Sequence, residues 1–598
     1  AASPTAAVYT TPDWLLYLNQ FRTQAGLSPL VESAALTAGA WQHSQYMARN
    51  DNAIARYQNT DKPFYSEAGH QAAVHGNIFA MRNSEATYLW AMNFWMSAPF
   101  HAIGILDPQL QSVGYGNFRD DLGAVRVAAV LDVESAINET IQANYPIYYP
   151  PNQGNTWVLR QNLIEYPEPL SHCPDFRKPA GPPLILQIGN GSLTPQVGSY
   201  SLTAAGVPLE VCLFHEANYT NTDPFAQERG RQLLNQRDAI VMIPREPLGV
   251  GQTYTAQIEA NGQFYQWSFT AVNPPPVTAE LIEPAAEVIG WHAFNVDGLE
   301  WGGQTHDFNH LTLMTQTGMR WVKFQQKWRA DSRPEELVQR INLARAHGFK
   351  VLVSLPGDPY PDSINYAAYT NFLRGVAALE TPPDAIEVWN EMNIDFEWPV
   401  GEINPTLYVE QMLKPAYEAI KSTNPQIMVI SGALAPTGFD NGTNAWASSR
   451  YMRGMVEAGA VNYTDCVGVH YNEGATSPRD EMGHPAGSYY GWYFQPSMSD
   501  YYFAFGGARP LCITELGILS GDGYAELPSR FWWAQQTSAA EQAQWLAEAL
   551  TIANDLGHIR LAIVFNVDIF DYGVDPQAGY AIIRPGGGCP FCELVTAN

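Results

Sequence analysis

Two glutamates in the C-terminal half of the chain occupy equivalent places, each at the end of a short apolar segment. Glu391 comes directly after Asn390 and follows the segment 385–388, and Glu515 follows the segment 511–514. If both segments are β-strands, each delivers one carboxylate at its C-terminal end. Two facing carboxylates are the groups that cleave a glycosidic bond with retention of configuration. The sequence therefore predicts a glycosidase reaction in this half of the chain.

This reaction needs the two carboxylates in different protonation states. A nucleophile must be ionised and needs hydrogen-bond donors around it, whereas an acid must keep its proton near neutral pH. Retaining enzymes place the two carboxyl groups about 5–5.5 Å apart. A single glutamate at a strand end is often a surface ion-pair partner, so the pair is the stronger signal. Opposite strands of one barrel can bring two carboxylates to this separation.

Apolar strand patterns alternate with helical patterns throughout the region that contains these glutamates. The expected strands are 288–291, 321–324, 351–355, 386–389, 428–431, 467–470, 511–514 and 561–565. One of the helices between them begins with a capping box formed by Ser538 and Glu541. Eight such units predict a (β/α)8 TIM barrel, whose active site lies at the C-terminal ends of the strands. Glu391 and Glu515 would end the fourth and seventh strands.

The order of the glutamates, the Asn-Glu pair and the Thr-Glu-Leu-Gly sequence around Glu515 resemble clan A glycoside hydrolases, near families 5 and 39. The resemblance implies that Glu391 is the acid/base, that Glu515 is the nucleophile and that Asn390 binds the sugar 2-hydroxyl. His470 and Tyr471 end the expected sixth strand, where this clan often has a histidine or tyrosine near the nucleophile. The implied substrate-binding set therefore includes both residues.

The resemblance covers about residues 285–585 and shows two departures from the clan's pattern. Lys323 and Gln325 lie where the clan often has an arginine after the second strand. The tryptophan common on the eighth strand is replaced by the sequence 565–568, Phe-Asn-Val-Asp. These departures leave the substrate and the subfamily open more than the type of reaction.

Aromatic and polar side chains near the expected strand ends are candidates for sugar binding. Five tryptophans are candidate platforms for sugar rings, although each could equally be a core residue: Trp291, Trp301, Trp328, Trp389 and Trp492. Other polar residues could bind hydroxyls or a structural calcium: Asp358, Asn393, Asp395, Glu397, Asn472, Glu473, Asp568 and Asp571. No spacing resembles a calcium loop, so neither a metal nor a cofactor is predicted.

The first 145 residues carry a different set of motifs. The segments 18–22, 26–30, 43–48 and 97–101, followed by 113–116, resemble CAP (SCP-like) domains over about residues 8–135. The resemblance implies an α-β-α sandwich with a metal tetrad of two histidines and two acids. Only His101 falls on a matching position, although Glu67, His70 and His75 could substitute. The alternative is a degenerate domain used for positioning or adhesion.

Residues 146–273 are expected to form a linker followed by a β-sandwich. Proline-rich joints at 145–151 and 273–276 predict stiff, extended spacers. Between them, short apolar or alternating segments predict strands, and Asn261-Gly262 is typical of a hairpin turn. Such strands suggest an immunoglobulin-like module without a catalytic constellation. The barrel domain would then span 274–598.

The composition restricts the environment and the partners of the chain. A length of 598 residues predicts several domains, and a formal charge of −27 makes nucleic acid an unfavourable partner. No apolar run reaches the roughly 18–20 residues that a membrane helix needs. The segment 1–7 resembles the mature end left by signal-peptide removal, which predicts a secreted protein. The N-terminal modules are then candidates for contacts with a cell surface or matrix.

The placement of the six cysteines suggests three local disulfides. The expected pairs are Cys173–Cys212, Cys466–Cys512 and Cys589–Cys592. An alternative for the last pair is half of a zinc site or a redox pair, although no second CxxC motif exists in the chain.

Two functions from different classes fit the sequence. The first is a secreted retaining glycosidase that attacks a β-linked polysaccharide. The second is a non-catalytic surface, assembly or carbohydrate-binding protein built on a glycosidase-like barrel. The intact pair of glutamates favours the first function, and the incomplete CAP tetrad keeps the second open.

Overall fold

The computed structural model describes residues 11–52, 54–120, 123–161, 163, 165–274, 299–357 and 364–597. The chain separates into two compact units. One unit comprises residues 14–82 and 86–276, and the other comprises 277–598 together with 1–13 and 83–85. Among the described residues, no helix is both long and apolar enough to cross a membrane.

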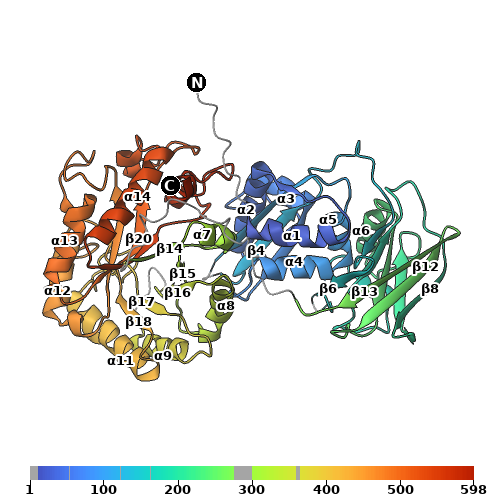
Figure 1. Cartoon of the computed structure of the whole chain (residues 1–598), viewed down its shortest axis with the longest axis horizontal. Coiled ribbons are helices and arrows are strands. Elements are labelled where there is room, and N and C mark those ends of the chain that lie inside the picture. Colours follow the sequence, from blue (N-terminus) through green and yellow to red (C-terminus); the bar gives the residue numbers. More distant parts are fainter. Residues whose placement is uncertain are drawn as a thin grey trace. The chain divides into compact units, whose positions relative to one another are not determined.

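The N-terminal domain is built on a four-stranded sheet in the order β1-β3-β4-β2. These strands are Val31–Glu32, Ser112–Arg119, Val127–Asp132 and Gly76–Met81. Strand β4 of this sheet is labelled in Figure 1. Gly114 and Gly116 of β3 face helix α2 (Ala34–Arg49), where a Cβ on Gly116 would lie 2.1 Å from the backbone nitrogen of Trp41. Tyr115 points to the opposite face, because side chains alternate along a strand.

Helices α1 (Asp13–Gln24) and α4 (Tyr88–Ser97) cover this opposite face of the sheet. The ring of Tyr115 lies 5.3 Å from that of Trp14 in α1 and 6.3 Å from that of Trp95 in α4. The domain thus has the predicted helix-sheet-helix layers. Two shorter helices, α3 (Glu67–His75) and α5 (Pro99–Ile105), complete it.

Residues 147–271 form a two-sheet module within the same unit. One sheet has the order β10-β11-β7-β5, from Val211–His215, Ala239–Pro244, Leu184–Gln187 and Ile147–Tyr149. The other has the order β6-β13-β12-β8-β9, from Gly154–Thr156, Gln263–Ala271, Thr253–Ala260, Val197–Ala204 and Val207–Leu209. Leu186 and Met242 of the first sheet share one core with Tyr254 and Trp267 of the second. The immunoglobulin-like topology stays a prediction.

Two local predictions for this module have different outcomes. Asn261 and Gly262 both take positive φ angles, 52° and 75°, and connect the paired strands β12 and β13 as expected for a hairpin turn. The proline-rich joint at 145–151 is no spacer, because Ile147–Tyr149 pairs with β7. Ile147 and Tyr149 are buried. Their burial stabilises a strand that the flanking prolines do not indicate.

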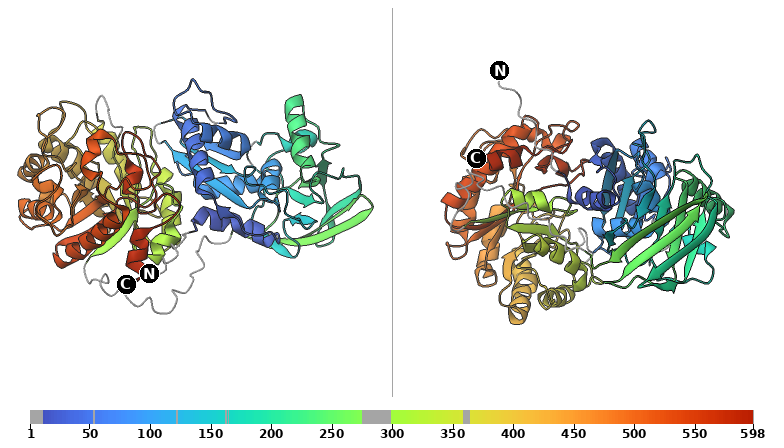
Figure 2. Two further views of the ribbon diagram at one scale, coloured as in Figure 1. Left: turned by 90° about the horizontal axis from the view of Figure 1, so that it is seen from above. Right: turned by 45° about the vertical axis from the view of Figure 1, so that its right-hand side comes forward.

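The C-terminal unit contains eight parallel strands that alternate with helices (Figure 1, Figure 2). In chain order, β14 to β21 are Glu300–Gln304, Trp321–Gln325, Lys350–Ser354, Ala385–Val388, Met428–Ser431, Val467–Gly474, Leu511–Ile518 and Ile559–Val564. The main helices that follow them in turn are α7 (Leu311–Gln316), α8 (Val338–Ala346), α9 (Tyr366–Ala377), α11 (Lys414–Thr423), α12 (Ser448–Glu457), α13 (Phe494–Ala504), α14 (Ala539–Asp555) and α15 (Pro590–Ala597). This is the element order of a TIM barrel.

Strands β18 and β19 stand at the two ends of the sheet order, and backbone hydrogen bonds between them close the barrel. The Ser431 nitrogen donates to the Cys466 carbonyl at 3.2 Å, and the Asp465 nitrogen donates to the Val429 carbonyl at 2.9 Å. The ends of all eight strands therefore meet around one ring. Side chains from the fourth and seventh strands can approach each other across it.

The first barrel strand differs from the prediction. The expected segment 288–291 lies outside the described residues, and the strand is Glu300–Gln304. It was missed because two glycines interrupt the apolar pattern. A Cβ on Gly302 would lie 1.9 Å from the Trp321 carbonyl oxygen, and one on Gly303 would lie 2.5 Å from Val567 Cγ2. Close packing with neighbouring segments therefore excludes the larger side chains that usually mark a strand.

All three predicted disulfides are confirmed: Cys173–Cys212, Cys466–Cys512 and Cys589–Cys592. The second bond joins the neighbouring strands β19 and β20. The third lies at the start of α15 and excludes the zinc alternative for its two cysteines. Two of the three bonds thus belong to the barrel unit.

Candidate active site

A sharp turn after strand β17 positions Glu391. The strand ends at Val388, and both Trp389 and Glu391 take positive φ angles, 75° and 41°. Such a conformation costs a residue with a side chain roughly 1–2 kcal/mol, so the surrounding structure must hold it. The Glu391 nitrogen donates to the Ala433 carbonyl at 2.8 Å, and this bond fixes the turn against the end of β18. Glu391 keeps 20% of its side chain exposed.

Strand β20 carries Glu515 into the barrel interior, where three side chains surround its carboxylate. Lys323 Nζ lies 3.2 Å from Oε1, and Asn472 Nδ2 donates to Oε2 at 3.2 Å. His470 Nδ1 lies 3.6 Å from Oε2. Burial alone would raise the pKa of Glu515, but His470, Lys323 and Asn472 outweigh burial and hold this pKa below its usual value. The site therefore keeps Glu515 ionised.

His470, on strand β19, links the two predicted catalytic residues. Its Nδ1 atom lies 2.9 Å from Glu391 Oε1. One ligand-type atom of Glu391, one of His470 and one of Glu515 all lie within 4.8 Å of one another. Burial disfavours a charged imidazole, but the carboxylates of Glu515 and Glu391 outweigh burial and raise the pKa of His470. The structure thus brings together the two glutamates that the sequence identifies.

A buried ionic network supports the pair from below, and the sequence analysis did not identify it. Lys323 is fully buried, and its Nζ lies 3.3 Å from Glu387 Oε2 as well as beside Glu515. Thr514 donates its hydroxyl hydrogen to Glu387 Oε1 at 2.6 Å. Burial lowers the pKa of Lys323, but the two carboxylates outweigh it and raise this pKa. Lys323 is therefore a permanent cation beside Glu515.

Two further glutamates lie near Glu391. Glu397 forms an ion pair with Lys327 at 3.1 Å, and Glu473 accepts a hydrogen bond from Trp492 Nε1 at 3.0 Å. Burial raises the pKa of each carboxyl to about 7, and the neighbouring charge of Glu391 adds to the effect. The sequence placed both glutamates near strand ends but could not indicate this shift.

Asn390 offers an unsatisfied polar atom next to Glu391, one of the two predicted catalytic residues. The residue is 5% exposed, and within the described part of the chain its Oδ1 atom has no hydrogen-bond partner. A buried amide oxygen without a partner costs free energy unless a ligand satisfies it. This oxygen suits a hydroxyl donor on a bound sugar.

The predicted tryptophan platforms differ in how deeply they are buried. Trp301 packs against Phe591. Trp389 is 1% exposed, and its Nε1 donates to the Glu397 carbonyl. Trp328 is buried with its ring edge-on to a tyrosine. Trp492 alone of the four described candidates is only partly buried, and Trp291 lies outside the described residues.

Tyr471 also lies in the protein interior and not at a surface that a sugar could reach. It is fully buried, its hydroxyl donates to the Trp492 carbonyl at 3.2 Å, and its ring packs edge-on against Phe494. These contacts support the segment that carries Trp492. We therefore assign Tyr471 no direct contact with substrate.

Glu391, Glu515 and His470 could in principle hold a divalent cation. They form the one group of three such ligands within the described ranges. Lys323 opposes a metal there, because its ammonium group lies 3.2 Å from Glu515 Oε1. A fixed positive charge at this distance repels a cation from the same carboxylate.

In the N-terminal domain the candidate metal ligands lie apart. His101 Nδ1 lies 2.7 Å from Glu165 Oε1, an acid of the neighbouring segment. His75 contacts Ser135 and His70 accepts from the Gln58 nitrogen. Glu67 bonds to Tyr65 and Gln71. Within the described ranges, no group of three ligands therefore assembles around His101.

Comparison with known proteins identifies the N-terminal domain. Residues 15–125 match the CAP family, the cysteine-rich secretory protein family, so the predicted CAP domain is confirmed. No curated protein shows a significant match to the chain.

Several solved glycosidase structures are similar to the chain at low levels. The GH53 catalytic domain of Ignisphaera aggregans is 15% identical, with 48% of this chain and 87% of that chain covered and a TM-score of 0.34. A GH10 endoxylanase from a sugarcane soil metagenome is 11% identical, with 50% and 96% covered and a TM-score of 0.34. The β-glucuronidase of Parabacteroides merdae is 9% identical, with 79% and 57% covered and a TM-score of 0.34. TM-scores this low support no structural inference, so the identification of the barrel rests on its strand order.

Proposed function

We propose that the barrel hydrolyses a β-linked polysaccharide with net retention of configuration. Glu515 is the nucleophile and Glu391 is the acid/base. The observation that carries this proposal is the approach of their carboxylates to within 4.8 Å, with Glu515 buried among cationic and amide donors. Retaining glycosidases need a separation of about 5–5.5 Å between the carboxyl groups.

The reaction proceeds by two displacements. Glu515 attacks the anomeric carbon while Glu391 gives its proton to the departing glycosidic oxygen. The covalent ester removes the negative charge of Glu515, and Glu391 then accepts a proton from the water that attacks the anomeric carbon. His470 bonds to Glu391 at 2.9 Å and orients the carboxyl during both steps. Asn390 Oδ1 accepts a hydrogen bond from a sugar hydroxyl.

Substitutions at the two glutamates test the assignment in the full chain. Glu515→Gln abolishes turnover without unfolding the protein, because a carboxamide is nearly isosteric but not nucleophilic. Glu391→Gln slows poor leaving groups by about 10²–10⁴-fold, the usual contribution of general acid catalysis, and affects activated aryl glycosides much less. Glu410→Gln, on an exposed position of the barrel, is the matched control and leaves activity unchanged.

The stereochemistry of the first product gives an independent test. Proton NMR of a cleaved substrate follows which anomer appears before mutarotation. We expect the β-anomer, and a fluoro-sugar that traps the intermediate should label Glu515. Release of the α-anomer, or full activity of Glu515→Gln, would falsify the two-glutamate mechanism.

We infer a secreted protein that meets its polysaccharide outside the cell. Three disulfides support this location, because such bonds persist in oxidising compartments. The CAP domain and the two-sheet module would contribute contacts to a cell surface or matrix. If no glycan is cleaved but glycans bind, the non-catalytic alternative replaces the enzyme.

A further inference from the structure

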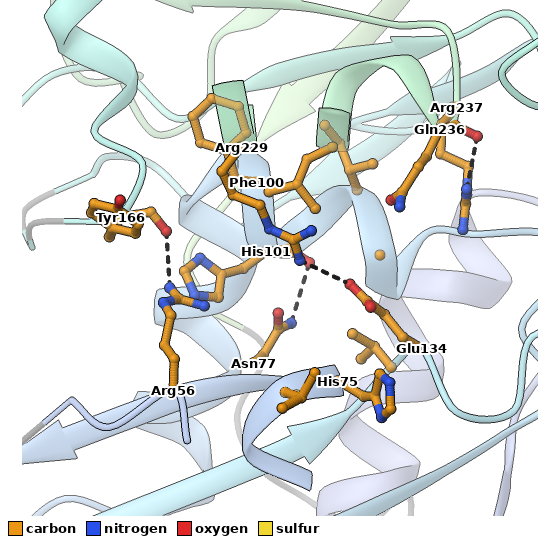
Figure 3. A pocket seen from close by; sticks show the side chains of 16 residues that line it. Arg56, His75, Asn77, Phe100, His101, Glu134, Tyr166, Arg229, Gln236 and Arg237 are labelled. Carbon is orange, nitrogen blue, oxygen red and sulfur yellow. Dashed lines mark hydrogen bonds and ion pairs between the residues drawn. The ribbon is translucent and has the colours of Figure 1, made fainter. Parts of the chain in front are cut away.

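A cavity in the N-terminal unit is lined by both the CAP domain and the two-sheet module (Figure 3). Its empty volume, with the open mouth included, is about 610 Å³. The polar walls include Arg56, His75, His101 and Glu134 from the CAP domain and Arg229 and Arg237 from the two-sheet module. This site is independent of the barrel and of the function proposed for it.

The pairing of these groups leaves Arg56 without a direct ion pair among the described residues. Arg237 is paired with Asp107, and His101 is paired with Glu165. Arg229 Nη2 lies 3.4 Å from Glu134 Oε1, a long contact. Within the described residues, no other carboxylate contacts a cationic side chain of the cavity wall.

Arg56 has no carboxylate partner of its own. Its Nη2 donates to the Tyr166 carbonyl at 2.9 Å, and in the described part of the chain it forms no ion pair. The carboxylates of Glu165 and Glu134 attract Arg56 at longer range, without a direct ion pair in the described part of the chain. Burial lowers the pKa of Arg56, and the charge of Arg229 lowers it further.

Part of the remaining wall is apolar, and Asn77 and Gln236 add polar groups to it. Phe100, Ile103, Val133 and Leu233 line it, and the guanidinium groups of Arg56 and Arg229 both point toward its interior (Figure 3). A planar guanidinium binds a carboxylate through two parallel hydrogen bonds, and apolar walls exclude water from a carbon skeleton. An inorganic anion would satisfy only the arginines.

We propose that this cavity binds a small organic carboxylate, with its charged group between Arg56 and Arg229 and its carbon skeleton against the apolar wall. The carboxylate can belong to an acidic sugar or to an aliphatic acid. The ligand carboxylate makes the direct ion pair that Arg56 lacks within the described residues. Binding weakens as salt concentration rises, because part of its free energy is electrostatic.

Isothermal titration of the full chain tests the proposal with four probes: glucuronate, hexanoate, glucose and inorganic phosphate. We expect saturable binding of glucuronate or hexanoate, and the tighter of the two identifies the kind of skeleton. Glucose, which matches glucuronate but lacks the charge, should not bind. Absence of binding by both carboxylates at millimolar concentration overturns the proposal, and so does tighter binding of phosphate.

Variants assign the binding to the two arginines. Arg56→Gln and Arg229→Gln should each weaken carboxylate binding at least tenfold. Arg231→Gln, two residues along the same helix α6 (Pro224–Asn235) and outside the cavity wall, should leave it unchanged. Equal affinity in all three variants would overturn the assignment.

Thermal unfolding without ligand separates a binding role from a structural one. Arg56 and Arg229 repel each other, so neither Gln variant should lower the melting temperature of the ligand-free protein. A large loss in both would show that the arginines only stabilise the fold. Arg56→Lys gives a second check, because it keeps the charge but loses the two-bond geometry and should bind with intermediate affinity.

Discussion

Replacing Lys323 with methionine removes the cation from the buried network beneath the catalytic pair. Its ammonium group lies 3.2 Å from Glu515 and 3.3 Å from Glu387, and its side chain has no exposed surface. Methionine has a similar length and can fill the same space. The substitution leaves two buried carboxylates whose remaining cationic neighbour is His470, which lies farther away. It therefore tests electrostatics more than packing.

The size of the effect follows from the burial of the pair. Removing one partner of a buried ion pair typically costs about 3–5 kcal/mol, because the remaining charge is left without compensation. The free energy of unfolding of a domain is about 5–15 kcal/mol, so the variant should still fold. Its melting temperature should fall by roughly 10 °C, since each kcal/mol shifts a large domain by about 2–4 °C.

A second substitution distinguishes charge imbalance from lost packing. In Lys323→Met/Glu387→Gln one carboxylate is neutralised together with the cation, and glutamine can still accept the hydrogen bond from Thr514. This double variant should recover at least about 1 kcal/mol of the lost stability, as interacting sites are not additive. Urea unfolding followed by tryptophan fluorescence measures all three proteins.

Activity provides the other measurement of this substitution. Without the positive charge of Lys323 the pKa of Glu515 should rise, so the acidic limb of the pH profile of kcat/KM should move to higher pH. A destabilisation below about 1 kcal/mol, no recovery in the double variant, or an unmoved acidic limb would each refute the reasoning.

Three further predictions concern the same chain. Glu473 has a pKa of about 7, well above its value in an unfolded chain, so the folded state holds a proton that the unfolded state releases. This proton should contribute up to about 3 kcal/mol to the fall in wild-type stability as pH rises from about 4.5 through 7, and urea unfolding of Glu473→Gln should show a fall that is smaller by that amount, because Glu397 still contributes its own. Loss of the Cys466–Cys512 bond, which spans 46 residues, should lower the free energy of unfolding by about 4 kcal/mol in a comparison of the wild type with the double alanine variant. Purified protein should contain no stoichiometric zinc by elemental analysis, and zinc that disappears in His101→Ala would contradict this.

Much of the barrel could be predicted from sequence because its parallel strands are buried on both faces. Such strands appear as apolar runs, and their regular alternation with helices fixes their order. The first strand was missed because Gly302 and Gly303 pack too closely against neighbouring segments for any side chain. Strand β5 was also not predicted, because prolines flank it, although they do not interrupt it.

The tryptophans show a different limit. A tryptophan at a strand end suits a sugar platform by its position, but exposure depends on where the backbone turns next. At Trp389 a positive φ of 75° directs the ring into a cluster with Tyr369 and Trp398. Gly357 accommodates this ring, because a Cβ there would lie 2.1 Å from it. No local pattern around Trp389 indicates this.

The predicted catalytic pair and the buried ionic network beneath it are specified by different features of the chain. Glu391 and Glu515 were identified because barrel topology alone brings the C-terminal ends of the strands to one rim. Lys323 and Glu387 lie within strands, where an isolated charge has no partner in its own segment. The bond from Lys323 to Glu515 spans 192 positions, and the bond from Thr514 to Glu387 spans 127. Those contacts depend on how the closed barrel sets the strands across its interior. The place of Glu515 is therefore specified locally, whereas its ionised state depends on residues that only the closed barrel brings together.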